Sequence, residues 1–76
     1  MAENPELDGL LAAWKAAVEE WVAAVREEER LALPDHSMQD WEAWDEAVLK
    51  EEEAGEKAAD ARQAYENSLR KALRNF

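Results

Sequence analysis

The sequence predicts an all-α fold: an antiparallel helical hairpin with a long second helix, pairing with a second copy into a homodimeric four-helix bundle. Trp14 and Trp21 lie one heptad apart in the first half of the chain, and Trp41 and Trp44 lie one turn apart in the second half. Pro34 separates the two halves. Apolar side chains that recur every three or four residues line one face of a helix, so each half is expected to form one amphipathic helix.

The first helix is expected to span about residues 5–31. Asn4 is a good N-cap for the unpaired amides of the first turn, and Pro5 suits the first helical position. The apolar stripe begins at Leu7 and follows a pattern close to a heptad repeat. Such a helix would be about 40 Å long.

A turn over residues 32–37 is expected to lead into a second helix over about residues 38–75. Pro34 disfavours helical geometry at Leu33, and Ser37 is the preferred N-cap of the next helix. A short turn between two amphipathic helices predicts that they pack antiparallel.

Gly55 stands near the middle of the second helix and is the one residue that would favour a break. No proline follows it, and Glu56 is not preceded by a residue that would cap a third helix. We therefore expect one continuous helix.

In a hairpin that turns near residues 34 and 35, the numbers of facing residues sum to about 70. This register places Trp14 opposite Gly55 and its small neighbours, and leaves about ten residues of the second helix without a partner.

Two sets of residues follow from this register. The expected core within one chain consists of the large apolar residues of the stripe: Leu7, Leu10, Leu11, Trp14, Val18, Trp21, Val25, Trp44 and Val48. The expected interface with a second copy, or with another protein, consists of residues at and beyond the crossing of the long helices: Ala58, Ala61, Arg62, Tyr65, Leu69, Ala72, Leu73 and Phe76.

Charge favours a second copy as the partner. If two long helices cross antiparallel near residue 62, the acidic segment Glu51–Glu53 of one copy approaches Arg70, Lys71 and Arg74 of the other. The alternative is a different helical protein that docks on the same apolar face.

Composition limits the classes of partner and the compartment. The chain of 76 residues, expected to be a single domain, carries a formal charge of −10, and residues 1–61 hold 18 of its 19 acidic residues. This surface should repel phosphate backbones and anionic lipids, so direct binding to nucleic acid or to membranes is not expected. The chain has no cysteine, and neither a signal peptide nor a membrane span is recognisable, so we expect a cytoplasmic protein.

No motif for catalysis, metal binding or cofactor binding is recognisable in the sequence. His36 stands in the turn between Asp35 and Ser37, but a polar turn with a helix cap needs the same residue types. Consecutive acidic residues such as Glu27–Glu29 point in different directions around a helix, so they do not form a metal site. We therefore expect a non-enzymatic interaction, scaffold or regulatory module. The alternative is an acidic mimic of nucleic acid that inhibits a basic DNA-binding protein or nuclease.

Overall fold

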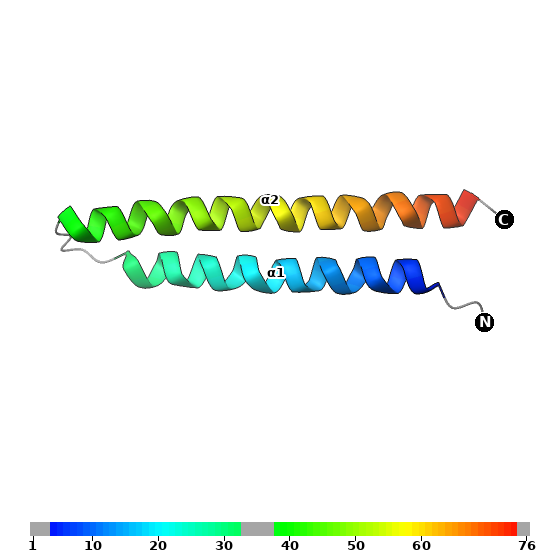
Figure 1. Cartoon of the computed structure of the whole chain (residues 1–76), viewed down its shortest axis with the longest axis horizontal. Helices are drawn as coiled ribbons and strands as arrows, with labels where there is room; N and C mark the ends of the chain where they lie inside the picture. The colour runs from blue at the N-terminus through cyan, green and yellow to red at the C-terminus, as the bar shows by residue number, and fades with distance from the viewer. Residues whose placement is uncertain (1–3, 33–37, 75–76) are drawn as a thin grey trace.

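The computed structural model describes residues 4–32 and 38–74, which form two α-helices packed side by side (Figure 1). Helix α1 spans Pro5–Leu31 and helix α2 spans Met38–Arg74. The helices run antiparallel, so the start of α1 and the end of α2 lie at the same end of the molecule (Figure 1). The all-α hairpin predicted from the spacing of the tryptophans is therefore confirmed. The turn residues Pro34, His36 and Ser37, and the C-terminal Phe76, lie outside the described residues.

The start of α1 is fixed by the predicted cap. Asn4 has an extended backbone, and its side-chain oxygen accepts a hydrogen bond of 3.1 Å from the backbone N–H of Leu7. Pro5 occupies the first helical position, where the missing N–H leaves no hydrogen bond unmade. A cap of this kind stabilises a helix by about 1 kcal/mol.

Helix α2 continues through Gly55 without interruption, as predicted. Polar side chains support its last turns. Glu66 accepts a hydrogen bond of 2.8 Å from Arg62 and lies 3.8 Å from the guanidinium of Arg70. Each exposed pair of this type contributes about 0.3–0.5 kcal/mol, so these pairs favour the helix without deciding the fold.

The register between the helices differs from the prediction. Trp14 stacks edge-on against Tyr65, with ring centroids 5.8 Å apart, and it is Trp21 that lies against Gly55. The predicted register was therefore wrong by about two helical turns. The physical reason is visible in Figure 1: α2 extends past α1 at both ends, so part of its extra length lies at the turn end. The long C-terminal overhang of α2 expected from the sequence is correspondingly shorter.

The hairpin is long and thin, and it does not enclose a core of its own. Its principal extents are 59 × 17 × 14 Å, and its radius of gyration is 17.5 Å, against roughly 11 Å for a compact domain of this length. Among the described residues, only Ala47 and Ala58 are buried, at 5% and 4% exposure. Two helices bury one strip each, so the large apolar side chains remain partly in contact with solvent.

Candidate interaction surface

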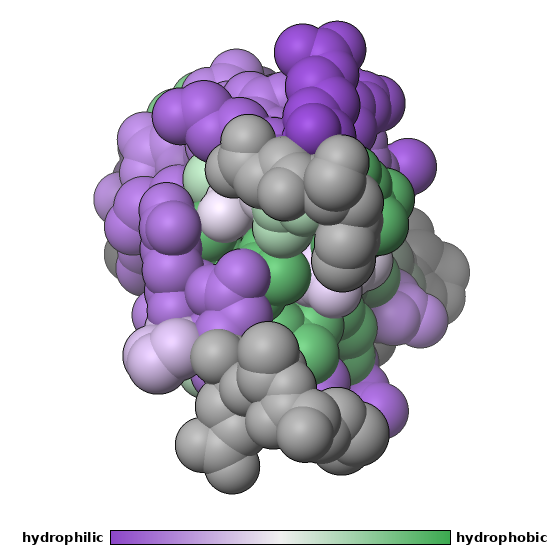
Figure 2. Space-filling view, turned by 90° about the vertical axis from the view of Figure 1, so that its right-hand side faces the viewer, coloured by the Kyte–Doolittle hydropathy of each residue, from purple (hydrophilic) through white to green (hydrophobic). Residues whose placement is uncertain are grey.

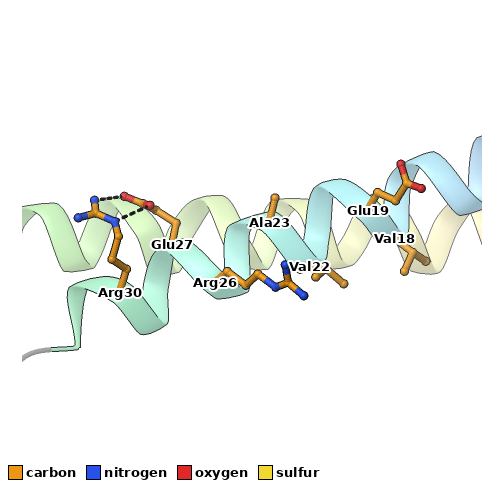
Figure 3. A pocket seen from close by; sticks show the side chains of 7 residues that line it. All are labelled: Val18, Glu19, Val22, Ala23, Arg26, Glu27 and Arg30. Carbon is orange, nitrogen blue, oxygen red and sulfur yellow. Dashed lines mark hydrogen bonds and ion pairs between the residues drawn. The ribbon is translucent and has the colours of Figure 1, made fainter.

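Helix α1 carries a second apolar row beside the one that faces α2. Trp14 and Trp21 belong to the row that packs on α2, because both contact residues of that helix. Leu11, Val18 and Val22 follow the adjacent row at spacings of seven and four residues. Val22 is 42% exposed. Figure 3 shows Val18 and Val22 along one edge of α1, so this edge presents apolar side chains to solvent.

Open hollows follow this row along α1. One, of about 390 Å³, is lined by Leu11, Trp14, Lys15, Val18 and Glu19. Another, of about 550 Å³, continues toward the turn end and is lined by Val18, Glu19, Val22, Ala23, Arg26, Glu27 and Arg30 (Figure 3). Val18 lines both hollows, so it stands at the middle of the row.

A third hollow connects this row to α2. It has a volume of about 340 Å³ and is lined by Trp14, Val18, Trp21, Gly55, Ala58, Ala59 and Arg62. The exposed row of α1 and the Gly55–Ala59 side of α2 therefore belong to one face of the hairpin. Leu73 stands five turns beyond Gly55 on this side of α2 and is 60% exposed.

We call this surface the open face. Its apolar and small residues are Leu11, Trp14, Val18, Val22, Val25, Gly55, Ala59 and Leu73. Seen along the helices, hydrophobic residues gather in the middle and toward one side of the hairpin, and mostly hydrophilic residues cover the opposite side (Figure 2). A surface of this composition suits association with another apolar surface.

Charged residues border the open face along α1. Arg30 donates two hydrogen bonds to the carboxylate of Glu27, of 3.0 and 2.5 Å (Figure 3). These hydrogen bonds, together with the positive charge of Arg30, lower the pKa of Glu27. Lys15, Glu19 and Arg26 line the same hollows, so both signs of charge alternate along this border.

A polar cluster links the helices nearer the turn. The indole N–H of Trp21 donates a hydrogen bond of 2.8 Å to Glu51. Glu28 is half-buried between the helices and faces the same carboxylate. Partial desolvation raises the pKa of Glu28, and the negative charge of Glu51, with which Glu28 also shares a hydrogen bond, raises that pKa further. The packing of the helices therefore brings two carboxyl groups close together.

The outer face of α2 is acidic. Asp45, Glu52, Glu56 and Asp60 recur at the spacings that bring side chains to one side of a helix, and all four are exposed. Leu49 lies among them and is 59% exposed. This face lies away from α1 and is separate from the open face.

The residues expected at an interface between chains have different positions in the hairpin. Ala58 is buried within the hairpin, and Tyr65 packs against Trp14 of the same chain. Arg62 is exposed and bound to Glu66, and Leu73 is exposed. Half-buried positions are occupied by Ala61, Leu69 and Ala72.

The residues expected in the core of one chain are only partly covered. Trp21 is 39% exposed. The others are half-buried: Leu7, Leu10, Leu11, Trp14, Val18, Val25, Trp44 and Val48. Sequence reasoning missed Val22, although its spacing from Val18 and Val25 signals the second row. It also missed the approach of Glu28 to Glu51, which depends on the register.

Within residues 4–32 and 38–74, no group of three His, Cys, Asp or Glu side chains is placed to hold a metal ion. In the same part of the chain, neither helix contains an apolar stretch that would cross a membrane. Comparisons with protein-family models, curated proteins and solved structures found no match.

Proposed function

We propose that this chain is a non-enzymatic interaction module that works as a homodimer, with two hairpins packed into a four-helix bundle. The observation that carries the proposal is the lack of a buried core: only two alanines are buried among the described residues, while Trp14, Val18 and Val22 line open hollows. A hairpin with this surface gains most by covering it with a second apolar surface.

The exposed area of the hairpin supports this proposal. Its solvent-accessible area is 6262 Å², whereas a compact monomer of 8.7 kDa would expose roughly 4,700 Å². The excess of roughly 1,500 Å² per chain exceeds the roughly 800 Å² that each partner buries in a standard protein interface. A second copy would bring the area per chain closer to that of a compact protein.

The polar surface supports a role in binding other proteins. Two hairpins joined through their open faces would leave the acidic outer face of α2 exposed in each copy. Such a dimer would present two equivalent surfaces to partners, as a scaffold or regulatory protein does. We propose the cytoplasm as its compartment, because a chain without cysteine is compatible with a reducing environment.

The proposal is tested by light scattering over a concentration series. We expect the native chain to have twice the monomer mass of 8.7 kDa at micromolar concentration and above. Val22→Glu and Leu73→Glu each place a charge on the open face at an exposed position, so we expect both to shift the protein to monomer without unfolding the helices.

Leu49→Glu is the matched control, because Leu49 is as exposed as Leu73 but lies on the acidic outer face of α2. It adds the same charge and should leave the mass unchanged. A native chain that remains monomeric at every concentration would refute the proposed dimer.

The acidic outer face of α2 favours a second candidate function, an inhibitor that imitates nucleic acid. Asp45, Glu52, Glu56 and Asp60 line about 20 Å of that helix. This candidate predicts competition with DNA for a basic protein, lost at high salt. Replacing Glu52 and Glu56 by Gln should weaken the competition, whereas Val22→Glu should not if inhibition needs only one hairpin.

A further inference from the structure

We infer that the second copy docks on the open face with the two α1 helices antiparallel and with Val18 on the two-fold axis. The inference rests on the proposed dimer and adds the surface and the register of its contact.

The apolar residues of α1 are arranged symmetrically about Val18. Trp14 and Val22 lie four residues on either side, and Leu11 and Val25 lie seven residues on either side. In a two-fold symmetric interface, if one residue contacts a second in the other copy, that second residue contacts the first. An antiparallel pair centred on Val18 therefore brings Leu11 of each copy against Val25 of the other, and the contact covers the middle of α1.

The charged residues bordering the open face agree with this register. Asp8 and Arg26 stand five turns apart on the same side of α1, and both are exposed. Across an axis at Val18, Arg26 of one copy lies about 3 Å along the helix from the position opposite Asp8 of the other, within reach of its long side chain. Lys15 and Glu19 are offset by the same amount. Each attractive pair occurs twice, so charge as well as shape favours a second copy as the occupant.

The α2 side of the open face also fits this arrangement. Val18 and Ala59 line the same hollow, so they lie at about the same height along the hairpin. With the axis at this height, the small and exposed side chain of Ala59 allows the two α2 helices to approach closely. The exposed Leu73 of one copy then falls beside Trp44 of the other. The two α2 helices then cross near Ala59. This point is within about one turn of residue 62, where the charge pattern of the sequence places the crossing.

Cysteine cross-linking tests the axis, because the native chain has no cysteine to compete. A disulfide requires Cα atoms within about 7 Å, a condition that a residue on the axis between packed helices meets. We expect Val18→Cys to give a covalent dimer within minutes of mild oxidation. Ala13→Cys is the matched control, since Ala13 is exposed on another side of α1 and should stay reduced.

Mixed variants test the antiparallel direction. Leu11→Cys and Val25→Cys refolded together should give the mixed covalent dimer at least several times faster than either variant alone. Circular dichroism of each variant before oxidation shows whether its helices have formed. Faster linking of each variant with itself would mean a parallel pair and would overturn the inference.

A charge exchange provides an independent test. Asp8 and Arg26 are about 27 Å apart along one helix, so they cannot pair within a chain. We expect Asp8→Arg and Arg26→Asp each to weaken the dimer about tenfold, and the double variant to restore its affinity. Single effects without restoration in the double variant would contradict the register.

The outcomes separate this inference from the proposed function. A native dimer that links through Val22→Cys or Leu73→Cys, but not through Val18→Cys, overturns the inferred axis and leaves the dimer standing. A native monomer that does not cross-link overturns both, and the open face would then be a site for another protein.

Discussion

The indole nitrogen of Trp21 lies 2.8 Å from a carboxylate oxygen of Glu51, a hydrogen bond that joins the two helices beside the backbone of Gly55. A Cβ atom at Gly55 would stand only 3.2 Å from that nitrogen. Glycine within a helix costs about 1 kcal/mol relative to alanine. At this position the cost is offset, because the absent side chain lets Trp21 lie directly on α2.

This relationship predicts that Gly55→Ala depends on Trp21. In a Trp21→Ala background, Gly55→Ala should stabilise the protein by about 1 kcal/mol, because only the helix propensity changes. In the native background the gain should be smaller or reversed, since the indole must shift by a few tenths of an ångström. Urea unfolding followed by circular dichroism, at one protein concentration, measures the difference. Equal effects in both backgrounds would show that the two residues do not touch.

Glu28 predicts a specific dependence of stability on pH. Partial desolvation and the nearby Glu51 raise the pKa of Glu28 above its ordinary value of 4.5. A carboxyl group with a raised pKa in the folded state is penalised once it ionises, so its contribution to stability falls as pH rises through that pKa. We expect Glu28→Gln to unfold at a higher urea concentration than the native chain at pH 7, and this advantage to disappear toward pH 4.

Glu20→Gln is the matched control for Glu28→Gln. Glu20 is exposed on the outer side of α1, and its replacement removes the same charge. If both variants change the urea midpoint equally at pH 7, the gain comes from the lower net charge of the chain and not from the contact between the helices.

The contact between Trp14 and Tyr65 predicts a coupling across the hairpin. Their rings meet edge to face at 5.8 Å, a geometry worth about 0.5–1.5 kcal/mol beyond the burial of area. Tyr65→Ala should cost about 2 kcal/mol at this half-buried site, whereas Tyr65→Phe keeps the ring and should cost little. A double-mutant cycle with Trp14→Ala measures the coupling. A coupling near zero would contradict the observed register.

The elements of the fold could be predicted from local signals. Asn4 and Pro5 mark the start of α1, and the spacing of the tryptophans marks two amphipathic helices. The continuity of α2 through Gly55 also followed from the sequence, because no residue after the glycine would cap a new helix. These features depend on neighbours within one or two turns.

The register could not be predicted, because it depends on how far each helix extends at the turn. Placing Trp14 opposite Gly55 assumed that the helices end level, whereas α2 reaches beyond α1 there (Figure 1). The shift brings Tyr65 to Trp14, and it also brings Glu28 to Glu51. The open face was not predicted, for a different reason. The row through Val22 lies beside the apolar stripe that faces α2, and in the sequence two adjacent rows cannot be told apart from one broad stripe.

Small-angle X-ray scattering can show whether a second copy covers the open face, because it gives mass and dimensions together. We predict twice the monomer mass of 8.7 kDa, with a maximum dimension close to the 59 Å length of one hairpin, because an axis at Val18 lies near the middle of α2. A mass of 8.7 kDa with a radius of gyration near 17.5 Å at every concentration would contradict the proposed dimer.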